Sequence, residues 1–226
     1  MGKMFSEVSE TWNPLGGECF HQCVYCWARK LAKEKNMQKY VGEPRLIEKE
    51  FNRKFKDGSF VFVQDMTDLF ADNVPKEYIV KVLDYVKKFP NVTFLFLTKN
   101  PRRYYCVGEL PQNAIYGATI ETNRVENNFS EAPNVLERSG YLDVLSLHWC
   151  KTMVSVEPIL DFDLVGTWNF VRCIRQTNPD FVYVGFDNYN NNLPEPEKLK
   201  VQALVDALRT FTEVRLKDSA IQRGIK

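Results

Sequence analysis

The sequence lacks any hydrophobic segment long enough to cross a membrane, and it lacks an excess of charge of either sign. No apolar run approaches the roughly 18 residues that a transmembrane helix requires. The first residues, from Met1 to Glu7, reach charged side chains without passing through the apolar core of a signal peptide. We therefore expect a cytoplasmic protein with no membrane partner. Thirty basic and 29 acidic residues leave a net charge of +1, so the charge of the whole chain says nothing about a nucleic-acid partner.

The composition also lacks the bias of a disordered, collagenous or low-complexity protein. Hydrophobic residues make up 44% of the 226 positions and charged residues 26%, which is the balance of a globular chain. A chain of this length can bury a sizeable core. Because no long linker or change of composition divides it, we expect a single domain over residues 1–226.

Short apolar runs alternate with helical patterns along the chain. Most runs are nearly continuous in apolar residues, which is typical of strands covered on both faces in a parallel sheet. Stretches with apolar residues at helical spacing separate them, such as the one around Ile79, Val82, Leu83 and Val86. The runs recur every 23 to 36 residues, which is the length of a βα unit. The predicted strands are Thr11–Pro14, Ser59–Gln64, Val92–Thr98, Ile115–Glu121, Met153–Pro158, Phe181–Gly185 and Glu213–Lys217.

Six or seven such units fit either an open doubly wound sheet or a (β/α) barrel, and the chain is slightly short for the about 250 residues of an eight-unit barrel. We predict an α/β fold: a partial (β/α)6-type barrel of mostly parallel strands. In both architectures the reactive groups gather at the carboxyl ends of the strands. Polar residues do follow the predicted strands at that edge: Asp65, Asp68, Lys99, Asn100, Glu121, Asn123, Glu157, Asp187, Asn188, Lys217 and Asp218.

Three of the six cysteines lie within eight residues. Cys19, Cys23 and Cys26 form a C-x3-C-x2-C pattern directly after the first predicted strand, whereas the other three are isolated. Without a secretory signal, this pattern favours metal binding or free thiols over disulfides. Three thiolates suit an iron–sulfur cluster that keeps one iron position open. Two alternatives stay open: His21 completes a Cys3His zinc site, or the three thiols are simply free or buried.

The cysteine pattern, with the aromatic Tyr25 before the third cysteine, resembles that of the radical S-adenosylmethionine superfamily. The resemblance implies a [4Fe–4S] cluster and S-adenosylmethionine as cofactors, and an electron donor of the flavodoxin or ferredoxin type. The reduced cluster would cleave S-adenosylmethionine to a 5′-deoxyadenosyl radical, which removes a hydrogen atom from the substrate. Further motifs are similar to those of a phage- and prophage-associated branch, whose barrel resembles that of spore photoproduct lyase, a DNA-repair member: Thr11–Pro14, Asp68–Phe70, Leu97–Pro101, Glu121–Asn123, Val154–Pro158 and Lys217.

The resemblance also implies cofactor-binding roles in the cysteine loop and at the carboxyl ends of the strands. Cys19, Cys23 and Cys26 would hold three irons, and Tyr25 would lie beside the adenine. Lys99 is expected to bind the methionine carboxylate. The remaining cofactor-binding residues are expected to be Asp68, in place of the family's Gly-Gly-Glu motif, Glu121 and Asn123 at the ribose, and Glu157.

Three later residues, Asp187, Asn188 and Lys217, are expected to bind the substrate. Cys106, just beyond the strand predicted at Val92–Thr98, is the candidate catalytic residue, because a thiol can return a hydrogen atom to the product radical. A capping or turn role is the alternative for the polar residues, and an inert thiol is the alternative for Cys106.

The segment Arg29–Lys56 carries ten Lys and Arg against four Glu. It is either an arm that contacts nucleic-acid phosphates beside the active site, or a solvated helix and loop.

Because a short barrel leaves its mouth open to a bulky substrate, we predict hydrogen abstraction from a nucleic-acid base or nucleotide, in modification or repair. The alternatives are a radical enzyme that acts on a peptide or small metabolite, and a zinc-binding protein without catalysis.

Overall fold

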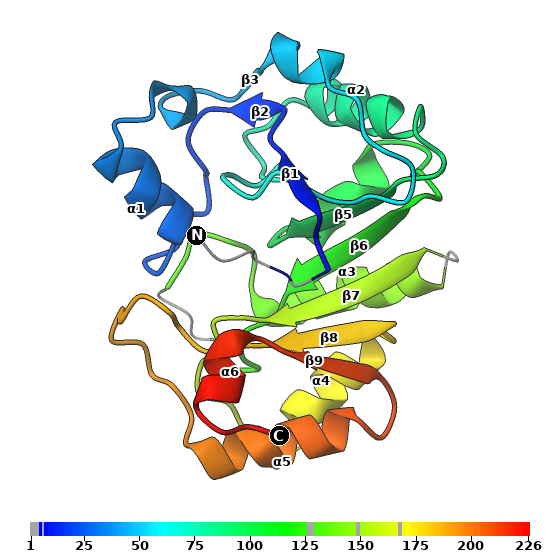
Figure 1. Cartoon of the computed structure of the whole chain (residues 1–226). Coiled ribbons are helices and arrows are strands. Elements are labelled where there is room, and N and C mark those ends of the chain that lie inside the picture. Colours follow the sequence, from blue (N-terminus) through cyan, green and yellow to red (C-terminus); the bar gives the residue numbers. More distant parts are fainter. Residues whose placement is uncertain (1–4, 6, 126–128, 148–149, 167–168) are drawn as a thin grey trace.

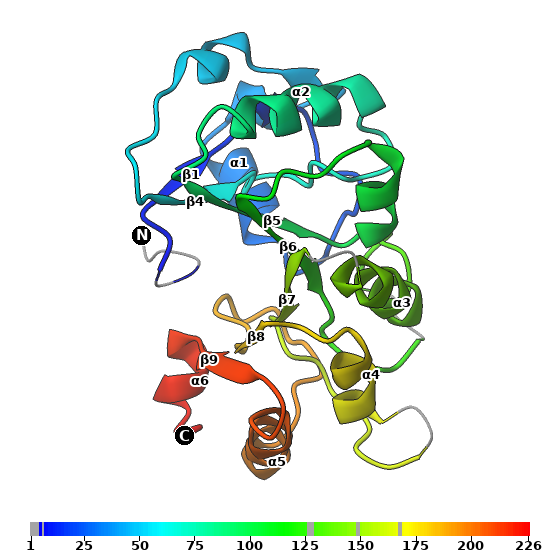
Figure 2. The same ribbon diagram turned by 90° about the vertical axis from the view of Figure 1, so that its right-hand side faces the viewer.

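Seven parallel strands form one sheet that makes up a partial barrel (Figures 1 and 2). The computed structural model describes residues 5, 7–125, 129–147, 150–166 and 169–226. The predicted α/β fold of mostly parallel strands is confirmed, and all seven predicted strands are present, each within two residues at either end. In their order across the sheet they are β1 (Glu10–Trp12), β4 (Phe60–Val63), β5 (Thr93–Thr98), β6 (Ala114–Thr119), β7 (Lys151–Val156), β8 (Phe181–Val184) and β9 (Glu213–Leu216).

Helices follow most of the strands and cover the outer face of the sheet (Figure 2). Their apolar stripes pack on the sheet to form the larger core of the molecule. None of the helices in the described ranges has the length and apolar character needed to span a bilayer. The helices are α1 (Trp27–Glu34), α2 (Lys76–Val86), α3 (Val135–Ser146), α4 (Phe170–Gln176), α5 (Lys198–Leu208) and α6 (Asp218–Gln222), with the 3-10 helices η1 (Gln38–Tyr40), η2 (Glu48–Asn52) and η3 (Pro101–Cys106).

Alternate residues of the strands enter two separate cores. On β5, Phe94 and Phe96 belong to the core under the helices, whereas Leu95 between them belongs to a smaller core on the inner face of the sheet. The N-terminal segment completes this inner core. The ring of Phe5 packs 5.4 Å from that of Phe62 and 4.5 Å from that of Tyr183. The inside of the partial barrel is therefore filled by side chains below its carboxyl edge.

A two-stranded hairpin that the sequence did not predict holds the start of the cysteine loop. Strand β2 (Leu15–Gly16) pairs antiparallel with β3 (Arg45–Leu46), and such two-residue strands are too short to give a periodic signal. Gly17 follows with φ +100, and a Cβ there would lie 2.5 Å from the carbonyl oxygen of Glu43. Only glycine fits this close approach, which fixes where the cysteine loop leaves the hairpin.

Candidate functional site

The three-cysteine loop is tied to the fold on both sides. The backbone N–H of Val24 donates to the carbonyl of Phe129 over 2.9 Å, and the carbonyl of His21 accepts from the N–H of Glu131 over 2.8 Å. At the end of the loop, Cys26 is the N-cap of α1, and its Sγ accepts from the N–H of Arg29 at 3.3 Å. The loop therefore ends at the N-terminus of α1, where the positive end of the helix dipole lies.

The three cysteines of the loop are of the ligand type that the predicted iron–sulfur cluster requires. Burial raises the pKa of Cys19 far above its usual range, and burial also raises the pKa of Cys23, against which the nearby Lys99 and Arg138 act. Coordination to a metal removes such protons, since the thiolate is the ligand. Within the described residues, no three Cys, His, Asp or Glu side chains are gathered closely enough to hold a metal ion. Cluster binding therefore requires the thiols to turn toward one another.

Glu121 is the centre of a buried charge network at the end of β6. Its Oε1 accepts from the hydroxyl of Tyr25 at 2.7 Å and from Nζ of Lys99 at 2.8 Å. Its Oε2 accepts from Nη1 of Arg138 at 2.7 Å. The ammonium of Lys99 also lies 5.3 Å from the centre of the Tyr25 ring. The structure thus brings together three predicted site residues, Tyr25, Lys99 and Glu121, and adds Arg138 from α3.

The electrostatics keep Glu121 ionised although it is completely buried. Burial alone raises the pKa of this carboxyl, but Arg138 and then Lys99 outweigh it and hold the pKa far below its usual range. Burial and the Glu121 carboxylate together raise the pKa of Tyr25 well above its usual value. The network therefore contains a carboxylate, a neutral phenol and two cations.

Asp68 holds a second part of the site by accepting four donors. Its Oδ2 accepts from the backbone N–H of Lys99 at 2.9 Å and lies 2.8 Å from Nε2 of His21. Its Oδ1 accepts from the N–H of Phe70 and the hydroxyl of Thr98, each at 2.8 Å. Burial raises the pKa of Asp68, but His21 and these hydrogen bonds leave it below its usual value. Asp68 thus fixes the backbone from which the Lys99 side chain extends.

A separate ion pair crosses the ends of the last three strands. Lys217 Nζ lies 3.1 Å from Oε2 of Glu157, and both side chains are largely buried. Val156, Val184 and Leu216 are paired side by side in the sheet, and Glu157, Gly185 and Lys217 follow them directly in the chain. Gly185 therefore stands between the two charged side chains. The ring of Phe5 lies 4.3 Å below the ammonium. Burial raises the pKa of Glu157 above its usual value, although Lys217 acts in the opposite direction.

The other predicted residues have partners of their own or are exposed. The amide of Asn123 bonds the backbone of Asp163 at 2.8 and 3.0 Å. The carboxylate of Asp187 accepts from Tyr189 and Asn191 in its own loop. Asn188 is exposed. Cys106 is exposed at the end of η3, where its thiol lies 3.8 Å from the carbonyl of Arg102. Substrate-binding and hydrogen-donor roles for Asp187, Asn188 and Cys106 stay predictions.

Sequence reasoning missed Arg138. It lies on the buried stripe of α3, with Val135 three residues before it and Leu142 four residues after it. An arginine at a core position of a helical stripe is rare unless it is paired. That mismatch between residue type and position is the signal that could have found it.

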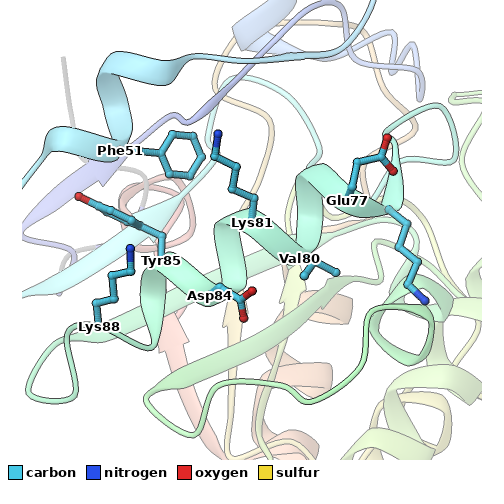
Figure 3. Close-up of a pocket in the computed structure, with 8 residues that line it drawn as sticks. Phe51, Glu77, Val80, Lys81, Asp84, Tyr85 and Lys88 are labelled. Carbon is cyan, nitrogen blue, oxygen red and sulfur yellow. The ribbon is translucent and has the colours of Figure 1, made fainter.

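A groove of about 630 Å³ lies elsewhere, on the outer side of α2 (Figure 3). Lys81 in this groove pairs with Glu48 at 2.9 Å and lies 4.8 Å from the ring centre of Phe51. The groove contains none of the predicted site residues. Its lining residues are Phe51, Lys76, Glu77, Val80, Lys81, Asp84, Tyr85 and Lys88.

Comparison with known families gives one match. The model of the family described as "Protein of unknown function (DUF5131)" matches residues 5–168. No curated protein sequence matches the chain.

Solved structures of similar fold include those of two kinds of protein. Spore photoproduct lyase, in a double mutant with bound AdoMet and dinucleoside spore photoproduct, is 12% identical, with a TM-score of 0.61 over 90% of this chain and 75% of that one. Streptococcus suis SuiB bound to precursor peptide SuiA is 10% identical, with a TM-score of 0.57 over 97% of this chain and 52% of that one. SuiB bound to S-adenosylmethionine gives a TM-score of 0.55 at 10% identity, over 94% of this chain and 51% of that one. At these identities the likeness is one of fold.

Proposed function

The chain belongs to the DUF5131 family, and from that premise we propose that it is a radical S-adenosylmethionine enzyme. One observation carries the proposal: the Tyr25–Glu121–Lys99 contacts join the three-cysteine loop to the carboxyl ends of β5 and β6. A thiol set for a cluster and a charged rim for a zwitterionic ligand are therefore parts of one site. Two structures of similar fold, which hold AdoMet or S-adenosylmethionine, support the proposal that this chain binds the same cofactor.

We assign the cluster to Cys19, Cys23 and Cys26, which leave one iron without a protein ligand. When bound and reduced, the cluster supplies the electron that cleaves S-adenosylmethionine to the 5′-deoxyadenosyl radical. The side chains of the chain bind and orient the cofactor. Tyr25, which is buried and held by Glu121, provides an aromatic face for the adenine.

The rim residues divide into binding and positioning groups. Lys99 binds the methionine carboxylate, because it is the partly exposed cation of the network. Glu121 serves the ribose through Oε1, which loses the donor Lys99 when that ammonium moves to the methionine carboxylate, with Asn123 two residues further on. Asp68 was expected to bind the cofactor in place of the Gly-Gly-Glu motif, but its four hydrogen bonds leave no free acceptor. We therefore assign Asp68 to the positioning of Lys99.

We place the substrate beside the Glu157–Lys217 pair, on the strands that the cofactor network leaves free. Glu157 was expected to bind the cofactor, but because it pairs with Lys217 we assign it to the substrate side. The substrate we propose is a nucleic-acid base or nucleotide. Four exposed cations of α1 and its C-cap, Arg29, Lys30, Lys33 and Lys35, support this choice. Among the described residues, the side chains of Arg29 and Lys30 donate to the neutral amides of Gln22 and Asn191, so we expect their charge to be available to phosphates.

Only part of the basic segment 29–56 is available in this way. Lys39 lies 3.6 Å from Glu50, Arg53 pairs with Glu10 at 2.6 Å, and Arg45 donates to backbone carbonyls of its own loop. These three side chains hold the loop together. Lys49, Lys54 and Lys56 are also exposed, but we place the phosphate contacts on α1, because its N-cap is Cys26, the last cysteine of the loop.

The first experiment tests the cluster. Protein reconstituted without oxygen is expected to hold four irons and four sulfides per chain, and its reduced electron paramagnetic resonance signal is expected to change when S-adenosylmethionine is added. Cys23→Ser is expected to abolish the cluster. Cys150→Ser, which changes an isolated cysteine, is expected to retain it. A wild-type protein that holds no cluster contradicts the proposal.

The second experiment tests the substrate class. The holoenzyme is incubated with S-adenosylmethionine, dithionite and deuterated DNA, RNA or nucleotides. Deuterium in 5′-deoxyadenosine from one of these supports the proposal, and transfer only from a labelled peptide supports the alternative class. A flavodoxin or ferredoxin is expected to replace dithionite as electron donor.

We also propose a cytoplasmic location, since all six cysteines are free thiols.

One observation favours a zinc protein as the second candidate. Among the described residues, Nδ1 of His21 is buried without a hydrogen-bond partner, while Asp68 holds Nε2. A histidine oriented by a carboxylate in this way is typical of zinc ligands. Metal analysis separates the two: a colourless protein with one zinc, which His21→Ala removes, supports the second candidate.

A further inference from the structure

Arg138 is buried more completely than its contacts explain. Its side chain has no exposed surface, and Nη1 donates to Oε2 of Glu121 and to the carbonyl of Thr119, both at 2.7 Å. Nε and Nη2 have no hydrogen-bond partner in the described part of the chain. A buried arginine with unsatisfied donors destabilises a fold, and a buried ion pair is often matched or bettered by apolar side chains. Stability alone therefore does not account for Arg138.

The network holds one more cation than its central carboxylate needs. Glu121 contacts both Arg138 and Lys99, on different oxygens. If Lys99 were its only counter-ion, moving Lys99 to a ligand would leave a bare carboxylate in the interior, which is strongly unfavourable. With Arg138 in place, Glu121 stays paired when Lys99 leaves.

The two cations differ in their freedom to move. Arg138 is enclosed on α3, whereas the Lys99 side chain is 11% exposed and its backbone is fixed by Asp68. Only the flexible stem of Lys99 has to rotate for its ammonium to change partners.

We propose that Arg138 is a positioning residue: it is the fixed counter-ion that holds Glu121, and it makes Lys99 the exchangeable cation of the site. The inference rests on the proposed function, in which Lys99 passes from Glu121 to the carboxylate of S-adenosylmethionine. It assigns to α3, a helix on the outer face of the sheet, a part in ligand binding.

A double-mutant cycle in ligand affinity tests the proposal. The dissociation constant of S-adenosylmethionine is measured by calorimetry on the reconstituted holoenzyme, at a temperature where circular dichroism shows every variant folded. Lys99→Met is expected to weaken binding roughly tenfold or more. In the Arg138→Met background, Lys99 is the only counter-ion of Glu121 and stays with it, so Lys99→Met is expected to change the affinity less than about twofold. Arg138→Lys is expected to restore part of the effect of Lys99.

The proposal is overturned if Lys99→Met and Arg138→Met have additive effects on the binding free energy of S-adenosylmethionine. It is also overturned if Arg138→Met binds S-adenosylmethionine with wild-type affinity. Lys81→Met is the matched control, because Lys81 also pairs with a glutamate and lies over an aromatic ring, but in the groove on α2 (Figure 3). It is expected to leave the affinity unchanged.

A second measurement does not depend on the cofactor. In urea unfolding of the cluster-free protein, Arg138→Met is expected to lower the folding equilibrium constant about a hundredfold or more, and Lys99→Met less than about tenfold. Equal losses overturn the division into a fixed and an exchangeable cation. If the wild-type holoenzyme fails to bind S-adenosylmethionine, the proposed function fails, and this second measurement still decides the role of Arg138.

Discussion

The hydroxyl of Tyr25 donates to Oε1 of Glu121 over 2.7 Å, although the two residues lie 96 positions apart in the chain. Both side chains are buried. The bond connects the cysteine loop to the carboxyl end of β6, so the position of the thiols depends on a strand that contributes no cysteine.

Replacing Tyr25 by phenylalanine removes this connection and keeps the ring. Because a buried hydrogen bond to a charged group is lost, the free energy of unfolding is expected to fall by about 1.5–3 kcal/mol. Hydrogen exchange of the amides of residues 19–26 is expected to become faster. Urea unfolding and exchange mass spectrometry measure the two effects. Tyr189→Phe, which changes an exposed tyrosine, is the control, and equal results for both variants contradict the prediction.

Glu121 makes stability depend on pH in one direction. Its pKa is lower in the folded protein than in the unfolded chain. Its contribution to the free energy of unfolding is therefore present above the unfolded-state pKa and is lost as pH falls through the folded-state pKa. The free-energy difference between wild type and Glu121→Gln is therefore expected to shrink as pH is lowered below about 4.5. Urea unfolding at a series of pH values measures it, and a constant difference argues against the assignment.

Glu157 is expected to act with the opposite sign. Burial raises the pKa of Glu157 in the folded protein. Its contribution to the free energy of unfolding is therefore fully present below the unfolded-state pKa and is lost as pH rises through the folded-state pKa. Glu157→Gln is expected to gain stability relative to wild type as pH rises from about 4 to about 7. The same unfolding series measures this change, and Glu121→Gln serves as the contrasting variant. A relative loss of stability with rising pH would show that Lys217 dominates the pair.

The strands and the cysteine loop were predictable because each leaves a local pattern. Continuous apolar runs mark strands that are buried on both faces, and C-x3-C-x2-C places three cysteines in one short loop. The carboxyl-end rule then placed Lys99 and Glu121 at the same edge, where the structure joins them.

The contacts between rim residues were not predictable from such patterns. Asp68 is saturated by donors from three segments, and Arg138 approaches Glu121 from a helix on the outer face. These relationships depend on how strands and helices pack side by side. Sequence spacing gives the edge at which a residue lies, but not the partner that it finds there.

Gly185 allows the Glu157–Lys217 pair to form. A Cβ at this position would lie 2.8 Å from Cγ of Lys217 and 3.1 Å from Oε1 of Glu157. Gly185→Ala is therefore expected to push the pair apart and to lower the free energy of unfolding by about 1–3 kcal/mol. Gly140→Ala in α3, where a Cβ meets nothing within 4 Å, is the control and is expected to raise it by about 0.5–1 kcal/mol. Urea unfolding compares the two, and a neutral Gly185→Ala would contradict the steric argument.

The exposed cations of α1 are expected to contact nucleic acid. Arg29 and Lys33 lie one turn apart on α1, whose N-cap is Cys26, and both are exposed. The double variant Arg29→Glu/Lys33→Glu is expected to weaken binding of mixed-sequence single-stranded DNA roughly tenfold or more, and to reduce the slope of log affinity against log salt by about 1–2. Fluorescence anisotropy at several salt concentrations measures both quantities. Lys76→Glu/Lys88→Glu, at the start of α2 and just beyond its end, makes the same change of net charge in the groove of Figure 3, so equal losses in the two variants would mean that only the total charge of the protein attracts DNA.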